Sequence, residues 1–260
     1  MSEIVHQLDD FDVATFASIA ARFGQERYGF VVTPNVDHMI RYHDDEAFRR
    51  LYGSAAYVLL DSRFASRLLR LTRGLRLRVC PGADLTARLI EQVVLPSDRI
   101  VLIGGSVEQA RCLTLAHRLE NLRHHNPPMG FIGDPHALEE CLRFVEDASP
   151  FRFCFLAVGS PQQEIAAELL QQRGKARGLA LCVGAAINFL TGAESRAPRW
   201  MQRAGIEWVY RLLRHPRRMA RRYLVRGPRI LLLLPRMRII LRRSQTVADA
   251  SVHPSAPTGR

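Results

Sequence analysis

The stretch 152-RFCFLAVGSPQQE-164 decides the fold class of this chain. It begins with a nearly continuous apolar run over 152–159, and a helix-like pattern follows over about 161–173. Continuous apolar runs are typical of strands in a parallel sheet, because helices cover both faces of such a sheet. Pro161 suits the first helical turn, where its missing N–H would have no partner anyway. The stretch therefore predicts a strand–helix unit of an α/β protein.

The same alternation extends in both directions along the chain. Further strands are expected at 29–33, 57–60, 76–80, 99–104, 129–133 and 179–184. Helices are expected between them at about 37–51, 63–72, 84–94, 106–124 and 136–147. This order predicts a Rossmann-like, doubly wound and mostly parallel sheet.

Positive charge is concentrated near the end of the chain. The net charge is +12, yet residues 1–195 contain 21 basic and 23 acidic residues. Residues 196–243 contain 15 arginines and a single acidic residue, Glu207. The sequence thus predicts an α/β catalytic domain over 1–195 and an Arg-rich helical appendage over 196–243. The Ser-, Ala- and Pro-rich stretch 244–260 predicts a disordered tail.

Composition excludes several classes of protein. The five cysteines form no CxxC pair and most lie in apolar runs, which predicts free thiols in a reducing cytosol rather than a disulfide scaffold. The acidic, polar N-terminus is unlike a signal peptide, and no apolar run approaches the roughly 20 residues of a membrane-spanning helix. The histidines show no metal-binding spacing, so no metal site is expected.

Polar residues follow the first two predicted strands. Ligands of open α/β sheets bind outside the carboxyl ends of the strands. Thr33 and Asn35 follow the first of these strands, and Asp61 follows the second directly, where partial burial would suit a catalytic base. The alternative is that Asn35 or Asp37, and likewise Asp61, caps the following helix.

Later strand ends add weaker signals. Gly104 and Gly105 precede a helix, and such a helix N-terminus can bind a diphosphate. Neither GxGxxG nor a Walker A lysine is present, which argues against a nucleotide-dependent oxidoreductase. Asp84, Gln163 and Glu164 lie in first helical turns, where capping is an alternative role, above all for Glu164.

The arginines of the appendage indicate an anionic partner. Arg217 and Arg221, like Arg218 and Arg222, are spaced i,i+4, at which like charges repel by a few tenths of a kcal/mol. The candidates are nucleic acid, an anionic membrane surface and a phosphate-bearing substrate. Large apolar residues lie between the arginines, which favours helices in a membrane interface over nucleic-acid binding. Arginine also binds diphosphate bidentately.

Taken together, these motifs resemble the WecG/TagA/CpsF family of bacterial glycosyltransferases over about residues 29–224. The matching motifs are 33-TPN-35, Asp61, 82-GADL-85, 104-GG-105, 159-GSPQQE-164, 196-RAP-198 and 206-IEWVYRLLRHPRRMARRY-223. The resemblance implies an inverting, metal-independent enzyme without a cofactor, peripheral on the cytoplasmic face of the membrane. Such enzymes transfer a sugar, typically N-acetylmannosamine from its UDP form, to an undecaprenyl-diphosphate-linked sugar in surface polysaccharide biosynthesis.

The resemblance also implies roles for individual residues. Asp61 would be the general base. The donor and acceptor pocket would include Thr33, Asn35, Asp84, Gly104, Gly105, Gln163, Glu164 and Asn188. Diphosphate or membrane binding would fall to Arg196, Arg211, Arg214, Arg217, Arg218, Arg221 and Arg222. Ser62 stands where the family often has glycine, and Asn188 stands where it often has aspartate, which leaves the donor sugar open.

Two alternative functions remain at this point: a nucleic-acid-binding α/β protein with a basic tail, and a nucleotide-dependent oxidoreductase. The oligomeric state, including a homo-oligomer, is open as well.

Overall fold

The computed structural model describes residues 4–242, except for the side chains of Arg218 and Pro235. The expected tail over 244–260 lies outside the described residues. In chain order, the elements are β1 (Ile4–Leu8), α1 (Val13–Ala21), β2 (Tyr28–Val32), α2 (Val36–Asp44), α3 (Glu46–Gly53), β3 (Tyr57–Val58), α4 (Arg63–Arg73), α5 (Gly82–Gln92), β4 (Arg99–Ile103), α6 (Val107–His117), β5 (Asn121–His125), the 3₁₀-helix η1 (Phe131–Gly133), α7 (Pro135–Asp147), β6 (Phe153–Leu156), α8 (Gln162–Arg173), β7 (Gly178–Cys182), α9 (Ala186–Leu190), α10 (Arg199–Arg203), α11 (Glu207–Arg214), α12 (Pro216–Ala220), the π-helix η2 (Arg221–Arg226), α13 (Arg229–Leu233), the 3₁₀-helix η3 (Leu234–Arg236) and β8 (Met237–Leu241).

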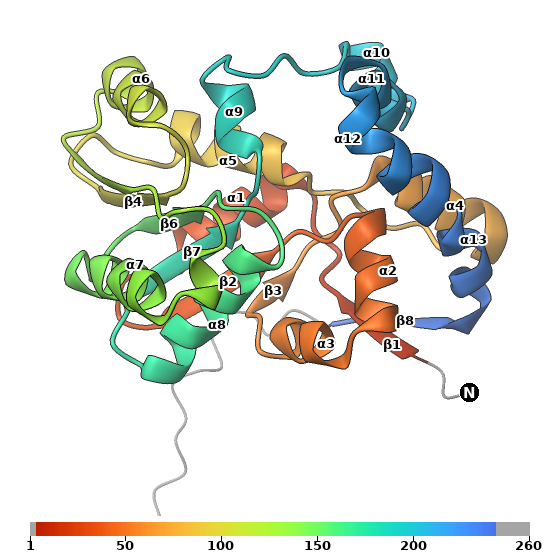
Figure 1. Cartoon of the computed structure of the whole chain (residues 1–260), viewed down its shortest axis with the longest axis horizontal. Coiled ribbons are helices and arrows are strands. Elements are labelled where there is room, and N and C mark those ends of the chain that lie inside the picture. The colour runs from red at the N-terminus through yellow and green to blue at the C-terminus, as the bar shows by residue number, and fades with distance from the viewer. Residues whose placement is uncertain (1–3, 243–260) are drawn as a thin grey trace, which may run out of the picture.

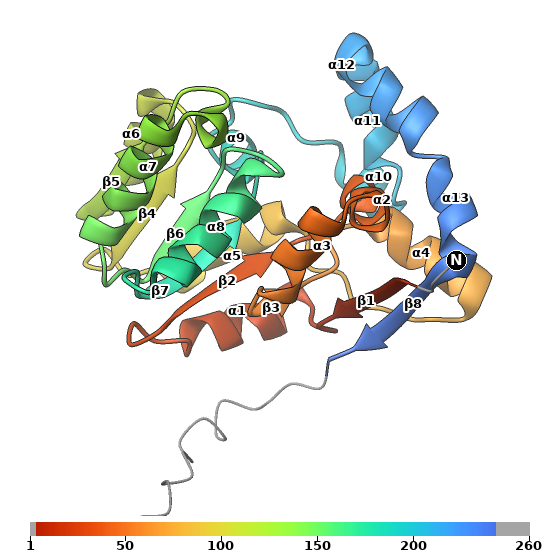
Figure 2. The same ribbon diagram turned by 60° about the horizontal axis from the view of Figure 1, so that its bottom comes forward.

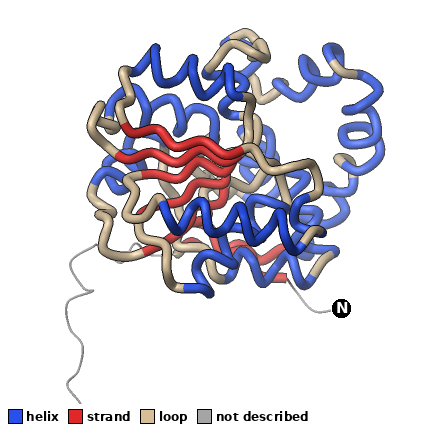
Figure 3. Tube along the Cα trace, turned by 60° about the vertical axis from the view of Figure 1, so that its left-hand side comes forward, coloured by secondary structure: helices blue, strands red, loops and turns tan. Residues whose placement is uncertain are grey.

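A six-stranded sheet in the order β3-β2-β7-β6-β4-β5 forms the centre of the molecule, and every strand pair in it is parallel. The central strands β6 and β7 pair in register, with Phe155 opposite Leu181. Figure 3 shows these strands side by side with helices on both sides. The predicted Rossmann-like fold class is confirmed.

Helices bury both faces of the sheet, as Figure 1 shows. Because side chains alternate along a strand, Phe155 packs into one hydrophobic cluster with α1, α5 and α9, whereas Leu156 packs into the other with α2, α3, α7 and α8. Phe155 and Leu156 are almost fully buried. Two covered faces explain the continuous apolar runs in the sequence.

Two of the expected strands are wrong. Residues 76–80 form no strand, although the Cys80 N–H donates to the Leu60 carbonyl at 2.8 Å. Residues 129–133 form a turn and η1, while the actual strand, β5, lies at 121–125 and overlaps the end of the helix expected at 106–124. Helix α6 ends at His117 because Arg118 adopts a left-handed conformation with φ 52°. As an edge strand, β5 pairs only with β4, so its sequence NLRHH carries no buried apolar run.

The two ends of the described chain meet in a second, two-stranded sheet. Strands β1 and β8 pair in parallel, with Ile4 opposite Met237. Next to them, the Arg242 guanidinium donates to the buried carboxylate of Asp9. Neither strand was expected, because their pairing joins residues more than 200 positions apart and leaves no local signal. The expected helical appendage is thus helical only as far as Arg236.

We call residues 196–242 the C-terminal segment. Figures 1 and 2 show its helices α10–α13 at one side of the molecule, beyond α2 and α4, and ending in β8 beside β1. The buried residues Ile230, Leu233 and Met237 join the same hydrophobic cluster as α2. Within residues 4–242, no helix is long and apolar enough to cross a membrane.

Candidate active site

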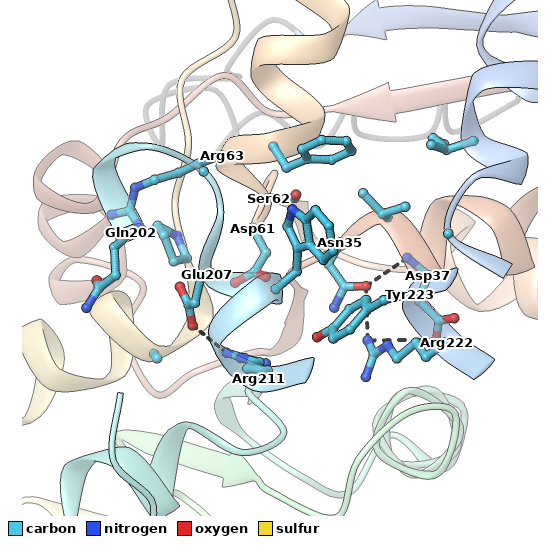
Figure 4. Close-up of a pocket in the computed structure, with 18 of the residues that line it drawn as sticks. Asn35, Asp37, Asp61, Ser62, Arg63, Gln202, Glu207, Arg211, Arg222 and Tyr223 are labelled. Carbon is cyan, nitrogen blue, oxygen red and sulfur yellow. Dashed lines mark hydrogen bonds and ion pairs between the residues drawn. The ribbon is translucent and has the colours of Figure 1, made fainter. Parts of the chain in front are cut away.

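A cavity of about 310 Å³ lies between the carboxyl ends of β2 and β3 and the C-terminal segment. We call it the Asp61 cavity, and Figure 4 shows part of its lining. Its floor includes Asn35 and Asp61, which follow the two strands. Its cover includes Glu207, Arg211 and Arg222 from the C-terminal segment. The fold therefore brings the predicted base and the predicted arginines together.

The N-terminus of α5 holds the Asp61 side chain in place. Its Oδ1 accepts a hydrogen bond from the Gly82 N–H at 2.8 Å, at the N-terminus of α5. A Cβ on Gly82 would lie 2.9 Å from Thr33 Oγ1, so glycine lets this helix approach the strand ends closely. Ser62, and not Asp61, caps α4, since its hydroxyl accepts from the Ala65 N–H at 3.1 Å. The capping alternative for Asp61 is therefore wrong, and its carboxylate is available at the cavity.

The surroundings of Asp61 favour a carboxylate that takes up protons more readily than usual. Burial raises the pKa of Asp61, while the hydrogen bond from Gly82 and the positive charge of Arg211 lower it only in part. The negative charge of Glu207 adds to the rise in pKa. A raised pKa brings a carboxylate closer to the range in which a general base works well.

Glu207 organises the arginines above Asp61. Its Oε1 accepts from Arg211 Nη2 at 2.7 Å and lies 4.0 Å from Arg196 Nε. Figure 4 shows Glu207 and Arg211 joined beside Asp61. Glu207 was not among the site residues predicted from the sequence, although it is the one acidic residue among the arginines of 196–243. That isolation was the signal that could have identified it.

Asn35 combines the two roles that were considered for it. Its side chain caps α2 by accepting from the Asp37 N–H at 3.0 Å and the His38 N–H at 3.4 Å. The same oxygen also accepts from Arg222 Nη2 at 3.4 Å, and Arg222 lies 3.8 Å from the Asp37 carboxylate. Asn35 therefore lines the cavity and connects the sheet to the C-terminal segment.

Three N–H donors at this cavity lack an acceptor. Arg196 Nε, Trp208 Nε1 and Arg222 Nε are buried and have no hydrogen-bond partner among the described residues. All three side chains line the Asp61 cavity. Buried donors are almost always paired in native proteins, so this grouping indicates a ligand rich in acceptor oxygens.

Asp84 lies next to the cavity but not in its lining. Its carboxylate accepts from Arg63 Nη2 at 2.8 Å and also from Arg196. Burial raises the pKa of Asp84, but the hydrogen bonds and charges of Arg196 and Arg63 outweigh it and bring the pKa below its usual value. Asp84 thus fixes Arg196, the first arginine of the C-terminal segment, to the N-terminus of α5.

Thr33, Gln163 and Glu164 are buried at the strand ends and line neither this cavity nor the hollow described next. The Thr33 hydroxyl donates to the Cys182 carbonyl at 3.3 Å. Gln163 accepts from the Gly184 N–H at 2.9 Å and donates to Glu164 at 3.0 Å. The contacts of Thr33 join the ends of β2 and β7, and those of Gln163 join α8 to the loop after β7.

Asn188 lies in a second hollow of about 600 Å³, next to the N-terminus of α6. We call it the Asn188 hollow. Gln109 donates to Asn188 Oδ1 at 2.9 Å and to Thr191 Oγ1 at 3.1 Å, and it forms a capping box with Ser106. The spacing of Ser106 and Gln109 is the usual signature of such a box, so this signal was present in the sequence but was missed.

Gly104 and Gly105 form the turn into α6. Both have positive φ angles, and a Cβ on Gly104 would lie 2.9 Å from the backbone of Ala157. Because of these glycines, the turn at the end of β4 can lie against β6 and open α6 beside the Asn188 hollow.

The predicted arginines fall into two groups. Arg196, Arg211 and Arg222 line the Asp61 cavity. By contrast, the side chains of Arg214, Arg217 and Arg221 are exposed. The side chain of Arg218 lies outside the described residues. Within residues 4–242, no group of His, Cys, Asp and Glu side chains is arranged to hold a metal ion.

The chain that combines this α/β sheet, a carboxylate at its strand ends and a basic cover is a glycosyltransferase. Residues 5–244 match the model of the glycosyl transferase WecG/TagA/CpsF family, and the chain belongs to that family. The resemblance seen in the sequence is confirmed. Family membership favours transfer of a glycosyl group over the nucleic-acid and oxidoreductase alternatives.

Proposed function

We propose that this protein is an inverting glycosyltransferase. It moves a sugar, N-acetylmannosamine or a related hexose, from a UDP-sugar to a sugar on undecaprenyl diphosphate at the cytoplasmic face of the membrane, in surface polysaccharide biosynthesis. The observation that carries the proposal is the partly buried Asp61 carboxylate, which lines one cavity together with Arg211 and Arg222.

Asp61 acts as the general base. It takes the proton from the acceptor hydroxyl while that oxygen attacks the anomeric carbon of the donor and UDP leaves from the opposite side. A single displacement of this kind inverts the anomeric configuration. The raised pKa of Asp61, which burial causes, suits proton uptake at this step.

The arginines bind and neutralise diphosphate, a role that a metal ion has in other transferases. Guanidinium groups bind diphosphates bidentately, and preorganised cations stabilise negative charge that develops on a leaving group. Arg196 and Arg222 present N–H donors without an acceptor, and Arg211 lies beside them. This supports diphosphate binding in the Asp61 cavity without a metal.

The nucleotide of the donor binds in the Asn188 hollow. Support comes from the N-terminus of α6, where backbone N–H groups and the helix dipole favour phosphate. Asn188 and Gln109 offer amide groups to a base or ribose in the same hollow. A Cβ on Gly105 would lie 3.2 Å from Gln109 Oε1 and 3.7 Å from Ile187 Cγ2, so this turn packs closely against Gln109.

The outer surface of the C-terminal segment contacts the membrane. Leu213, Leu224 and Leu232 are exposed there, beside the exposed arginines Arg217 and Arg221. Interleaved apolar and cationic side chains are typical of helices in an anionic membrane interface. Each arginine near such a surface contributes about 1 kcal/mol to binding.

The test is to replace Asp61 by asparagine. Purified protein is incubated with a panel of UDP-sugars and a lipid-diphosphate sugar acceptor, and the product is identified by mass. Asp61→Asn is expected to lower the rate by roughly 10²–10⁴-fold, as the loss of a general base does. The matched control is Asp134→Asn, because Asp134 caps the distant helix α7 and asparagine caps equally well. Wild-type turnover in Asp61→Asn, with an unchanged circular dichroism spectrum, contradicts the proposed role.

A further inference from the structure

The lining of the Asp61 cavity is charged in one part and apolar in another. The charged part contains Asp61, Glu207, Arg211 and Arg222, as described above. The remaining lining includes Phe64, Trp208 and Tyr223 together with Ile230 and Leu231. A diphosphate has no complementary group on the hydrocarbon surface of this apolar wall.

The apolar wall is built from α4, α11, η2 and α13, and three of its residues form a row of aromatic rings. The Trp208 ring lies between Phe64 and Tyr223, with centroid distances of 6.5 and 6.0 Å. Phe64 comes from the first turn of α4, and Leu231 comes from α13. Figures 1 and 2 both show α13 beside α4. The wall therefore joins the α/β part of the chain to the C-terminal segment.

This wall continues into the exposed apolar surface. Leu231 lines the cavity and is nevertheless 54% exposed. Its neighbour Leu232 is 72% exposed and does not line the cavity. An apolar chain can thus lie against Leu231 in the cavity and reach the surface there.

Trp208 is where the two kinds of lining meet. Its ring belongs to the aromatic row, while its buried Nε1–H, like the Nε–H groups of Arg196 and Arg222, has no acceptor within residues 4–242. Donors for an anion therefore stand directly against an apolar surface. The ligand that matches this juxtaposition is an amphiphile whose phosphate is joined directly to a hydrocarbon chain.

We propose that the wall of Phe64, Trp208, Tyr223, Ile230 and Leu231 binds the isoprene units next to the diphosphate of the acceptor. This inference rests on the proposed function, which supplies a polyprenyl diphosphate as the carrier. At about 310 Å³, the cavity is at the lower end of the roughly 300–1,000 Å³ typical of small-molecule sites, so it holds only the first part of the chain. The protein thus recognises the hydrocarbon directly, and the remaining isoprene units of the acceptor stay in the membrane.

The first experiment measures binding without a membrane. Trp200, 63% exposed, is replaced by phenylalanine so that Trp208 is the only fluorescent tryptophan. Its fluorescence is titrated with farnesyl diphosphate and with inorganic diphosphate, in detergent-free buffer. Farnesyl diphosphate is expected to bind at least tenfold more tightly, because burial of even one isoprene unit is worth on the order of tenfold in affinity. Equal affinities for the two ligands overturn the inference.

The second experiment compares neighbouring residues of α13. Leu231→Asn is expected to reduce the preference for farnesyl diphosphate about tenfold and to leave the affinity for inorganic diphosphate unchanged. Leu232→Asn is the matched control: it should keep the preference and weaken sedimentation with anionic vesicles. Leu231→Ala is a milder second variant. If its circular dichroism spectrum is unchanged, a reduced preference for farnesyl diphosphate in this variant does not come from a folding defect. An equal loss of preference in the Leu231→Asn and Leu232→Asn variants contradicts a site inside the cavity.

A sugar-transfer assay distinguishes the isoprenoid site from the proposed glycosyltransferase function. With a farnesyl-diphosphate sugar as acceptor, Leu231→Asn should raise KM and leave kcat unchanged. If the wild type transfers sugar equally well to acceptors with and without a hydrocarbon tail, the inference fails and the proposed function stands. If a Leu231-dependent preference is measured but no acceptor is glycosylated, the proposed function fails and the isoprenoid site stands.

Discussion

The α/β part of the chain and the C-terminal segment differ in the burial of their side chains and in their charge. In the α/β part, strands such as β6 are buried on both faces, and acidic and basic residues nearly balance. In the C-terminal segment, arginines dominate and most helical side chains are exposed or half-buried. Polar contacts such as Arg196–Asp84, Arg229–Asp44 and Arg242–Asp9 join the segment to the rest.

This difference separates two tasks within one active site. A buried sheet can hold Asp61 in a fixed position, because dense packing permits few alternatives. The more exposed basic helices suit an anion and an apolar chain. Under the proposed function, the reacting group therefore comes from a buried region, and the groups that bind its substrate come from a more exposed one. Substitutions in each region test this separation.

The largest expected effect tests whether the C-terminal segment is part of the folded core. Met237 of β8 is fully buried in the cluster shared with α2. Met237→Ala should lower the free energy of unfolding by about 2–5 kcal/mol, as other large-to-small core substitutions do. Urea denaturation measures it, and Ile240→Ala on the more exposed side of the same strand is the control. A loss below about 0.5 kcal/mol for Met237→Ala would show that the segment is only loosely attached.

The next prediction contrasts an arginine inside the cavity with one outside it. Arg222→Ala should lower kcat/KM for a soluble diphosphate acceptor by roughly 30–100-fold, because a charge-assisted hydrogen bond is lost in a buried site. Arg217→Ala should change it less than about threefold, since Arg217 is exposed. Similar losses in both variants would mean that the arginines act through their summed charge and not through position.

A smaller effect is expected at Trp208. Trp208→Phe keeps an aromatic ring but removes the buried N–H that has no acceptor among the described residues. Affinity for inorganic diphosphate should fall about tenfold, the lower end of what one hydrogen bond to a charged group contributes. Isothermal calorimetry measures it, with Trp200→Phe as the control. An unchanged affinity would remove Trp208 from the anion site and leave it only in the apolar wall.

The smallest effect concerns the pH dependence of the reaction. The proposed general base, Asp61, would work only when deprotonated, so activity is expected to fall as the pH drops through its raised pKa. Because Glu207 contributes to that rise, Glu207→Gln should move the acid limb of the kcat/KM profile to lower pH, by less than about one unit. A shift to higher pH, or none, would mean that Glu207 acts on Asp61 only by holding Arg211.

Much of the fold follows from local patterns, and the exceptions have physical causes. The buried strands β2, β4, β6 and β7 were predicted from their apolar runs, because double burial leaves a strong signal. Strand β5 was missed because an edge strand needs no such run. The pairing of β1 with β8 was missed because it depends on contacts between the two ends of the chain.

The sequence by itself determined the parallel α/β architecture, the family and the position of Asp61 at a strand end. These features depend on neighbouring residues, so short motifs are enough to reveal them. Only the tertiary structure decided that Asn35, Glu207, Trp208 and Leu231 share one cavity, and that Asn188 lies in another hollow. The reason is that packing brings α11 and α13 over strands some 150 residues earlier in the chain, and no local pattern records that contact.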